Sequence, residues 1–371
     1  MSLLDTLGVR RVINADARLT RLGGSLMPPE VRAAMEDAAR AYVDMFELQE
    51  AVGRRLAELT RNEAAFVCTG AAAGLFLAAL ACMAGASPER IARLPLLDGC
   101  RDEIVIHRAH RVPYDQAVRL AGARLVEIGN HGPPTPEELA AAIGSRTAAV
   151  LYVAGAHLAG GALPLPEVVA VARAHGLPVI VDAAAQLPPP ENLWRFTRDL
   201  GADLAIFSGG KDLAGPQASG LIVGQAGLVA ACAAHAAPHQ RLGRPMKVGK
   251  EELAGLLAAV ERYLRLDHAA RIARFEQIVA DWVAALDDGA GVRARRVFPN
   301  EAGQPTPRLL LTLDPARCSV SGDELRRRLW EDSPRIAVAS AGEHGISLTP
   351  DTLEPGEELL VVAAIQRVLR R

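Results

Sequence analysis

Short apolar runs alternate with segments of helical periodicity over the first two thirds of the chain. Residues 103–106 and 148–153 are apolar runs of strand length, whereas residues 165–175 repeat apolar residues at helical spacing and end at Gly176. Strands are expected at residues 64–68, 103–106, 124–128, 148–153, 178–181, 203–207 and 220–224. The alternation predicts a large, doubly wound α/β domain, whose mixed and mostly parallel sheet is covered by helices on both faces.

The pattern changes after this series of strands. A long amphipathic helix is expected over residues 250–266. The later elements are a strand at 308–313, a helix at 322–330, a strand at 336–339 and a C-terminal helix at 357–369. We therefore expect an irregular N-terminal arm at residues 1–27, a large domain at 28–250, and an interdomain helix with a small α+β domain at 251–371.

Composition narrows the classes of function. The 371 residues are 50% apolar, which is enough for a large core or two packed domains. A formal net charge of -2 argues against a dedicated nucleic-acid surface. The five cysteines include no CxxC pair, so neither a disulfide framework nor a metal site is expected. Without a signal-peptide pattern or a membrane-length apolar segment, we expect a cytoplasmic protein that contacts no membrane.

Two polar residues follow successive expected strands. Asp182 ends the run at 178–181, and Lys211 ends the sequence Phe207-Ser-Gly-Gly-Lys after the next run. An amine and a carboxylate in this order suit pyridoxal phosphate (PLP): the amine forms a Schiff base, and the carboxylate keeps the pyridinium nitrogen protonated. Each residue has an ordinary alternative, since the aspartate could cap a turn and the lysine could be a solvated loop residue. Their occurrence together favours the cofactor role.

Small residues precede Lys211, and a second group of small residues follows the expected strand at 64–68. The glycines before Lys211 let the backbone bend and a bulky ring approach. A GxxxxGK[ST] phosphate loop is excluded, because Asp212 follows the lysine. Ser208 either donates to the cofactor phosphate or serves as a turn hydroxyl, and neither role is favoured. The segment Thr69-Gly-Ala-Ala-Ala-Gly74 either serves close helix packing or presents backbone N–H groups at a helix N-terminus, which is a site for the phosphate.

Histidines and cations supply the remaining candidates. His107 follows the strand at 103–106 and could stack its imidazole on the cofactor ring, with His110 as the alternative; a histidine bonded to turn backbone is the ordinary interpretation. Arg244 and Lys247 lie just before the long helix. Cations at that end oppose the helix dipole, so their clustering favours an anionic partner over a solvated helix start.

Several motifs are specific in combination. They are Arg11-Val-Ile-Asn-Ala15, Leu19-Thr-Arg-Leu-Gly-Gly-Ser25, Thr69–Gly74, Val181-Asp-Ala-Ala-Ala-Gln186, and Phe207–Lys211 followed by Gly215-Pro-Gln217. They resemble the selenocysteine synthase (seryl-tRNA selenium transferase)-like family of PLP enzymes, and within it the D-glucosaminate-6-phosphate ammonia lyase branch. The resemblance is strong over residues 7–265. It implies the aspartate aminotransferase fold (fold type I) and a homo-oligomer built on dimers, in which subunits share active-site residues.

The resemblance also implies roles for individual residues. The expected cofactor-binding residues are Thr69, Gly70, Ala71, His107, Asp182, Ala184, Gln186, Ser208 and Lys211. Arg244 and Lys247 align with basic residues that bind an anionic co-substrate in some family members. Arg18, Arg21 and Arg308 are further candidates for holding a substrate anion, and no metal is expected.

Three segments depart from the pattern of the family. Asp16-Ala-Arg18 replaces Ala-Gly-Thr, Ala109–Pro113 replaces a glycine-containing loop, and Asp212 replaces a glycine. All three could lie near the substrate, and none affects the residues that the cofactor needs. They therefore bear on the identity of the substrate.

The expected function is that of a PLP-dependent lyase catalysing α,β-elimination on a β-hydroxy amino acid or an amino-sugar acid, giving a 2-oxo acid and ammonia. Lys211 would abstract the Cα proton, and Asp182 would keep the cofactor ring protonated. A racemase or an aminotransferase would use the same residues and stays open. A selenium-transferase-like protein acting on aminoacyl-tRNA, or a cofactor-binding regulator, is disfavoured because the chain is not basic.

Overall fold

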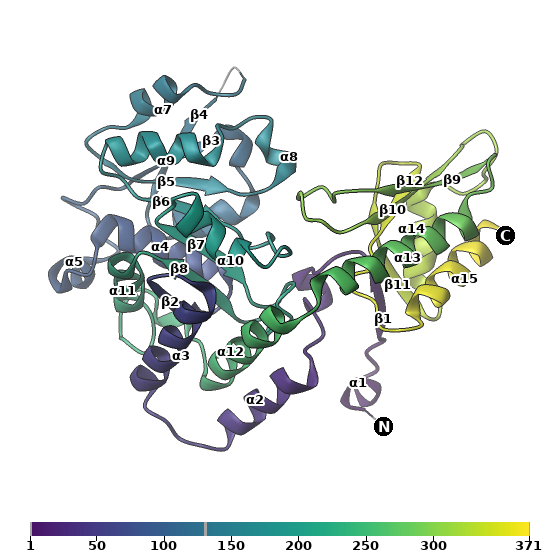
Figure 1. Cartoon of the computed structure of the whole chain (residues 1–371), viewed down its shortest axis with the longest axis horizontal. Coiled ribbons are helices and arrows are strands. Elements are labelled where there is room, and N and C mark those ends of the chain that lie inside the picture. Colours follow the sequence, from purple (N-terminus) through teal and green to yellow (C-terminus); the bar gives the residue numbers. More distant parts are fainter. Residues whose placement is uncertain (1, 130–131, 371) are drawn as a thin grey trace. The chain divides into compact units, whose positions relative to one another are not determined.

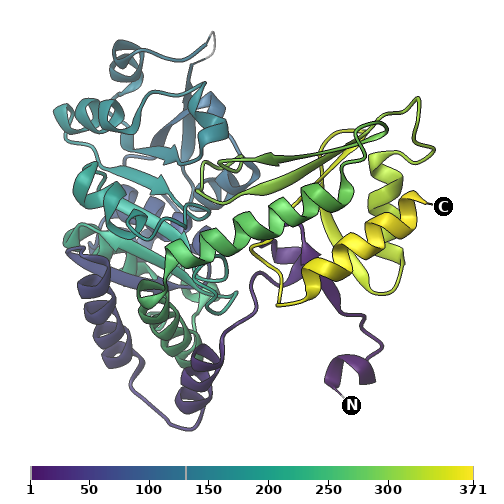
Figure 2. The same cartoon turned by 45° about the vertical axis from the view of Figure 1, so that its right-hand side comes forward.

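The computed structural model describes residues 2–129 and 132–370, and these residues form two compact units. The larger unit comprises residues 25–266 and 301–303, and the smaller comprises the described residues of 1–24, 267–300 and 304–371. Each unit has its own sheet and its own apolar core. Figures 1 and 2 show the elements of each unit from two directions.

The larger unit is built around a seven-stranded sheet with the order β2-β8-β7-β6-β5-β3-β4. Its strands are β2 (Ala64–Cys68), β3 (Glu103–His107), β4 (Arg124–Ile128), β5 (Thr147–Val153), β6 (Val179–Asp182), β7 (Leu204–Ser208) and β8 (Gly220–Gly224). Strands β4, β3, β5, β6 and β7 run parallel, whereas β8 is antiparallel to both β7 and β2. The strands expected from the apolar runs therefore form at nearly the expected residues.

Helices cover both faces of this sheet. They are α2 (Pro29–Ala39), α3 (Met45–Thr60), α4 (Ala71–Ala84), α5 (Pro88–Arg93), α6 (Gln116–Leu120), α7 (Pro136–Ala142), α8 (Ala156–Ala159), α9 (Leu165–Ala174), α10 (Asn192–Trp194), α11 (Ala226–His235) and α12 (Lys250–Arg265). One apolar core joins the sheet to α3, α7, α9 and α12, and the other joins it to α4, α6 and α11. Val105 and Ile106 lie in different cores, because successive strand residues point to opposite faces.

The smaller unit has a five-stranded sheet with the order β1-β11-β12-β10-β9. Its elements are α1 (Leu3–Thr6), β1 (Val12–Ala15), α13 (His268–Leu286), β9 (Val292–Val297), β10 (Arg308–Leu313), α14 (Gly322–Glu331), β11 (Arg335–Ser340), β12 (Gly345–Leu348) and α15 (Glu357–Leu369). The expectation that residues 1–27 are irregular is wrong at β1, which pairs in parallel with β11. Ile13 and Ala15 are buried there, so an apolar core orders this segment.

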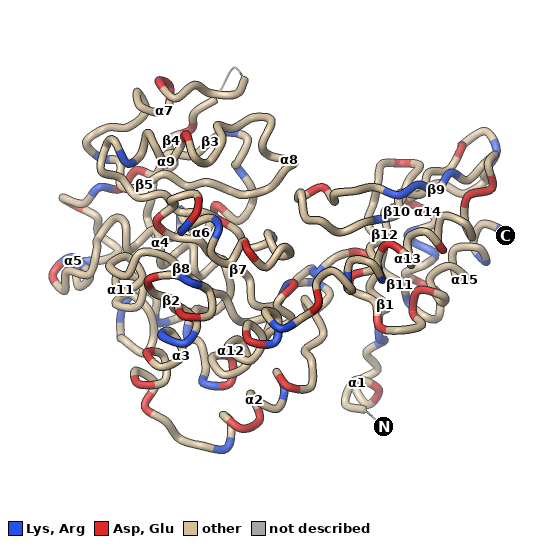
Figure 3. Tube along the Cα trace, viewed as in Figure 1, with Lys and Arg blue, Asp and Glu red and all other residues tan. Residues whose placement is uncertain are grey.

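Charged residues of both signs are interspersed along each unit (Figure 3). Among residues 2–129 and 132–370, no helix has both the length and the apolar character of a membrane span.

Candidate active site

Parallel pairing brings Asp182 and Lys211 to one edge of the larger sheet. Asp182 is the last residue of β6 and lies opposite Ile206 of β7. Ser208 ends β7 and is half-buried, and Lys211 follows three residues later. Because parallel strands end at the same edge, both chemical groups lie on the carboxyl side of the sheet, where open α/β sheets bind their ligands.

The Asp182 carboxylate is buried, with 7% of the residue exposed. Its Oδ1 accepts a hydrogen bond from the Ala184 N–H at 3.0 Å. Burial raises the pKa of Asp182, while the Ala184 N–H and the positive charge of Lys211 act in the opposite direction. A further cation or charged N–H donor at this carboxylate would favour its ionised form, which is what a protonated pyridine nitrogen supplies.

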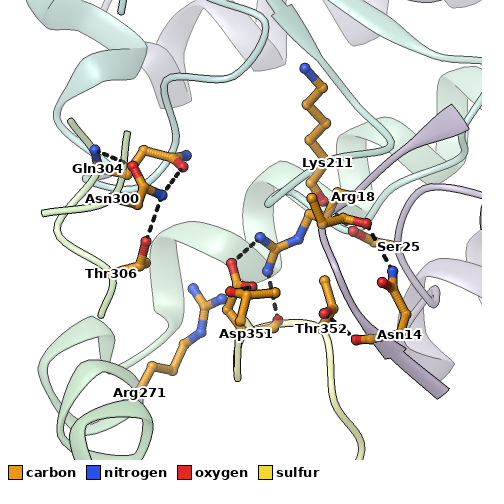
Figure 4. Close-up of polar contacts among 12 residues, drawn as sticks. Asn14, Arg18, Ser25, Lys211, Arg271, Asn300, Gln304, Thr306, Asp351 and Thr352 are labelled. Atoms are coloured by element: carbon orange, nitrogen blue, oxygen red, sulfur yellow. Dashed lines mark hydrogen bonds and ion pairs between the residues drawn. The ribbon is translucent and has the colours of Figure 1, made fainter. Parts of the chain in front are cut away.

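Lys211 lies in a tightly closed loop. The Gly209 N–H donates to the Ser219 carbonyl, and the Gly215 N–H donates to the Gly209 carbonyl, both at 2.9 Å. The Lys211 carbonyl accepts from the Ala214 N–H at 2.9 Å and from the Ser25 hydroxyl at 2.7 Å. Figure 4 shows this hydroxyl at the Lys211 backbone, with the lysine side chain extending away from it.

Backbone strain accompanies this closure. Ala214 has a φ of 54°, a left-handed conformation that costs free energy for a residue with a Cβ. The contacts around Lys211 therefore hold the loop in a shape that its residues would not adopt alone.

Thr69, Gly70 and Ala71 form a turn at the N-terminus of α4. Gly70 has a φ of 85°, which favours glycine, and no side chain caps the helix in the described structure. A Cβ on Gly220 would lie 2.5 Å from the Gly70 carbonyl carbon and 2.8 Å from the Ala71 nitrogen. The first residue of β8 therefore packs directly on the backbone of the turn. First-turn N–H groups without a side-chain cap suit a phosphate.

Ala184 and Gln186 hold the turn that follows Asp182. Gln186 is 9% exposed, and its Nε2 donates to the Ala154 carbonyl at 3.0 Å. The backbone N–H of Gln186 donates to the Ala183 carbonyl, also at 3.0 Å. These two predicted residues therefore lie beside Asp182 and fix its surroundings.

His107 and His110 lie at the ends of β3 and of the turn after it, and neither presents an exposed ring face. His107 is 0% and His110 is 1% exposed. Their ring centroids are 4.8 Å apart, and the ring of Tyr152 lies 4.6 Å from that of His110. Burial lowers the pKa of His107 to about 4, and burial together with His107 lowers the pKa of His110 to about 3. Stacking of either ring on a cofactor stays a prediction.

Arg244 and Lys247 lie in and after a 3₁₀ turn (Arg244–Met246) that precedes α12. Arg244 is half-buried and Lys247 is exposed, and within the described part of the chain neither forms an ion pair. Further along α12, Leu256 borders the Lys211 loop, since a Cβ on Gly209 would meet its side chain at 2.8 Å. At 1.5 Å per residue, the start of α12 is about 9 Å along the helix from this contact.

The smaller unit holds the other arginines in internal contacts. Arg21 Nη2 lies 2.5 Å from Asp16 Oδ2, and burial raises the pKa of Asp16 against the opposing charges of Arg21 and Arg308. Arg18 pairs with the carboxylate of Asp351 and donates to its carbonyl at 2.8 Å (Figure 4). Arg18 and Arg21 therefore each have a carboxylate partner already.

Sequence reasoning missed the contact of Ser25 with the Lys211 carbonyl, and it also missed a signal in the composition of the chain. Ser25 is 186 positions away from Lys211, and a Gly-Gly-Ser segment is only a weak signal of a contact at that distance. A stronger signal lies in composition: only Lys211, Lys247 and Lys250 among the 41 basic residues are lysines. An arginine stays charged, whereas a lysine amine can be deprotonated, so a lysine kept in an arginine-rich chain is a candidate for chemistry. No group of three or more metal-ligating side chains occurs in the described ranges.

Comparison with known proteins finds a matching family model and similar proteins over nearly the whole chain. A family model described as L-seryl-tRNA selenium transferase matches residues 12–297. The chain is 39% identical to 5'-C-glycyluridine monooxygenase-decarboxylase of a Streptomyces species, over 98% of this chain and 91% of the relative. It is 34% identical to D-glucosaminate-6-phosphate ammonia lyase of Salmonella typhimurium, over 99% of this chain and 98% of the relative.

Solved structures extend the comparison to the fold. The structure of a D-glucosaminate-6-phosphate ammonia-lyase has a TM-score of 0.87 and 33% identity, over 100% of this chain and 98% of that one. Aspartate aminotransferase of Thermotoga maritima has a TM-score of 0.54 and 17% identity, over 99% and 94% of the chains, and shows the fold alone. The expected fold class, the aspartate aminotransferase fold, is confirmed.

Proposed function

Because this chain belongs to the L-seryl-tRNA selenium transferase family, we propose that it is a PLP-dependent lyase with Lys211 as the cofactor-binding lysine. The observation that carries the proposal is the placement of Asp182 and Lys211 at one edge of a parallel sheet. The N-terminus of α4, which no described side chain caps, offers backbone N–H groups to the phosphate.

The described residues suit PLP at three of its groups, the aldehyde, the ring nitrogen and the phosphate. The amine of Lys211 would bind the aldehyde carbon, and the Asp182 carboxylate would accept the ring N–H. The backbone at Thr69, Gly70 and Ala71, with the Ser208 hydroxyl, would bind the phosphate. When bound, the cofactor supplies an electron sink for negative charge at the substrate Cα.

The residues of this chain handle the protons of the reaction. The free Lys211 amine would remove the proton from the substrate Cα. Asp182 would keep the ring nitrogen protonated by remaining a carboxylate. Loss of the β-hydroxyl as water, followed by hydrolysis of the product enamine, gives a 2-oxo acid and ammonia, so one water leaves and one returns.

The relatives support an amino-sugar acid or a related β-hydroxy amino acid as the substrate. D-glucosaminate-6-phosphate and 5'-C-glycyluridine are both amino acids on a sugar framework. Oxidative decarboxylation is the second candidate reaction, because the identity to the monooxygenase-decarboxylase, 39%, exceeds the 34% to the ammonia lyase. The elimination needs no oxygen, whereas the second reaction consumes oxygen and releases carbon dioxide.

A substrate panel decides between these reactions. The purified protein is incubated with D- and L-β-hydroxy amino acids and amino-sugar acids, phosphorylated and not, while ammonia, 2-oxo acid and dissolved oxygen are measured. Equal amounts of ammonia and 2-oxo acid with no oxygen uptake support the lyase. Oxygen uptake with release of carbon dioxide supports the second candidate, and interconversion of enantiomers without ammonia supports a racemase.

Trapping locates the cofactor. We expect a yellow protein whose visible absorbance is bleached by borohydride, with the reduced adduct on Lys211. The chain has only two other lysines, Lys247 and Lys250, so peptide mapping separates the three sites. An adduct on either of the others would contradict the proposal.

Arg244 and Lys247 are proposed to bind an anionic group of the substrate. They form no ion pair in the described residues and precede the positive end of the α12 dipole, where an anion would stabilise both. Arg244→Ala should raise KM about tenfold for an acidic or phosphorylated substrate, with the cofactor absorbance unchanged, and Arg244→Lys should recover only part of the loss. An unchanged kcat/KM in Arg244→Ala would assign the anion to other residues, with Arg308 the next to test.

The assembly and location also belong to this proposal. We propose a cytoplasmic homo-oligomer built on dimers that acts on a small molecule and not on nucleic acid. Light scattering of the purified protein and a gel-shift assay with tRNA test both parts. A monomer that is fully active, or a stable tRNA complex, would overturn the corresponding part.

A further inference from the structure

Strand β5 extends beyond its neighbour β3 at the carboxyl edge of the sheet. The last register pair between β3 and β5 is Ile106 with Leu151, whereas β5 stays paired with β6 as far as Val153 with Asp182. The N–H groups of Val150 and Ala154 donate to carbonyls on the β6 side. Since strand N–H groups alternate in direction, the Val153 N–H faces the side where β3 has already ended.

His110 supplies the acceptor that β3 no longer provides. The chain leaves β3 through a 3₁₀ turn at Arg108–His110, and this turn brings Nδ1 of His110 to 3.2 Å from the Val153 nitrogen. An imidazole nitrogen accepts a hydrogen bond only in the neutral ring, with the proton on the other nitrogen. The geometry therefore requires a neutral His110 protonated at Nε2.

The surroundings of His110 keep its ring neutral and fixed. Tyr152 meets it edge-on at an interplanar angle of 82°, and His107 lies against it at 57°. His107 is fully buried, and neither of its ring nitrogens has a hydrogen-bond partner within the described residues. The enclosure excludes water from the ring and limits it to one orientation.

The fixed end of β5 also holds Asp182. Ala154, which follows Val153, donates its N–H to the Asp182 carbonyl at 3.0 Å. The carbonyl of Ala154 accepts from Gln186 Nε2 at 3.0 Å, and Gln186 closes the turn after Asp182. Ala154 thus brackets the Asp182–Gln186 turn, and its position depends on the hydrogen bond at the residue before it.

We propose that His110 is a positioning residue, which orients the Asp182 carboxylate through the backbone of Val153 and Ala154 by substituting for a strand acceptor. The inference rests on the proposed role of Asp182 at the cofactor ring nitrogen. It gives His110 a different task from stacking on the cofactor, since its ring is held edge-on by Tyr152 and engaged at Nδ1.

Two variants of His110 test this role in the cofactor-loaded protein. His110→Leu keeps an apolar side chain but removes the acceptor, whereas His110→Asn places an amide oxygen near the position of Nδ1. In the leucine variant we expect kcat to fall roughly tenfold or more, with KM little changed and with a shifted midpoint in the pH titration of the visible cofactor absorbance. The asparagine variant should recover most of the rate and the wild-type midpoint.

Hydrogen exchange reads the proposed bond directly. Peptides covering residues 150–156 should exchange faster in His110→Leu than in wild type and stay slow in His110→Asn. His175→Leu is the matched control, because His175 is an exposed histidine whose Nδ1 contacts only its own helix at Val171. It should change neither exchange at 150–156 nor the titration.

The outcomes separate this inference from the proposed function. If wild-type protein carries no trapped cofactor on Lys211, the proposed function fails. If the wild type is loaded and Asp182→Asn is impaired, but His110→Leu keeps the wild-type kcat and titration, only the inference fails. Should His110→Leu not fold, His110→Asn decides alone: slow exchange with a wild-type rate supports the role, and slow exchange with a tenfold slower rate, or fast exchange with a wild-type rate, overturns it.

Discussion

Two groups of titratable side chains lie at the carboxyl edge of the same sheet, and the neighbours of each group act differently on its charge. Asp182 ends β6 and Lys211 follows β7, whereas His107 ends β3 and His110 lies in the turn after it. Asp182 is 7% exposed and His107 is 0% exposed, so both are removed from water. Burial penalises the charged form in each group: it raises the pKa of Asp182 and lowers that of His107.

The difference comes from the partners. Asp182 has the Ala184 N–H and the charge of Lys211 to oppose the cost of burial. For His110, the neighbouring His107 acts in the same direction as burial and lowers the pKa further. The partners of Asp182 therefore favour its ionised form, whereas the neighbour of His110 adds to the effect of burial, and the neutral ring accepts a hydrogen bond. Burial alone does not mark a reactive residue; the groups that face it do.

Removing the amine of Lys211 should lower turnover more than any other change in either group. Lys211→Ala deletes both the covalent link to the cofactor and the Cα base, so we expect turnover to fall by about 10³-fold or more, with loss of the borohydride-sensitive absorbance. Steady-state kinetics and absorbance spectra measure both. Lys250→Arg is the control, because Lys250 contacts the Ala38 carbonyl and Glu251 and should leave the spectrum intact. A Lys211→Ala protein that turns over normally would contradict the assignment.

Neutralising the carboxylate of Asp182 should lower kcat by a smaller factor. Asp182→Asn keeps the shape of the side chain and removes its charge, so we expect retained cofactor and a loss of about 10²-fold in kcat. Asp203→Asn is the matched control: Asp203 precedes β7, its burial raises its pKa, and its Oδ2 accepts from the Val179 N–H at 2.8 Å. That variant should lower stability without changing the cofactor spectrum. Equal kcat in Asp182→Asn and wild type would refute the role.

The neutral histidines should make stability depend on pH in a defined direction. Their pKa values of about 4 and about 3 in the folded protein lie below the ordinary 6.5, so the unfolded chain binds more protons over this range. The free energy of unfolding is therefore fully retained above pH 6.5 and falls below it, by about 1.4 kcal/mol per pH unit for each imidazole. Urea denaturation between pH 7 and 5 measures the slope, and His107→Phe should reduce it by one proton. An unreduced slope in that variant would show that His107 is already charged when folded.

Sequence reasoning succeeded where local order decides the structure. The apolar runs placed the parallel strands, and residues at the ends of parallel strands meet at one edge, so Asp182 and Lys211 followed directly. The small residues at Thr69–Gly74 indicated a helix N-terminus, and α4 begins there at Ala71. These features depend on spacing within a few residues.

Sequence reasoning failed where contacts between distant segments, or burial, determine the local structure. Strand β1 exists because Val12 pairs with Arg335, and β9 carries three arginines in six residues, so neither has a strong local signal. Burial of His107 could not be foreseen from a histidine at a strand end, because it depends on the distant residues that pack on the ring. The pairing of Arg18 with Asp351 likewise joins segments far apart in the sequence, so no local pattern predicts it.

A substitution at Gly220 should have the smallest effect of these variants on the Asp182 and Lys211 site. A Cβ at this position would lie 2.5 Å from the Gly70 carbonyl carbon, so Gly220→Ala must displace the turn at the N-terminus of α4. Because the phosphate would bind there, we expect PLP affinity to fall about tenfold, or about 1.4 kcal/mol, with a lowered melting temperature. Titration of the cofactor-free protein with PLP measures the affinity.

Gly227→Ala is the matched control for this variant. Gly227 lies in α11, and a Cβ there would meet nothing within 4 Å, so neither the PLP affinity nor the melting temperature should fall. The two readouts in Gly220→Ala carry different information, because a displaced turn lowers stability wherever the phosphate binds. A lowered melting temperature with unchanged PLP affinity would therefore place the phosphate away from α4, whereas a loss of affinity confined to Gly220→Ala ties the anion to the backbone of Gly70 and Ala71.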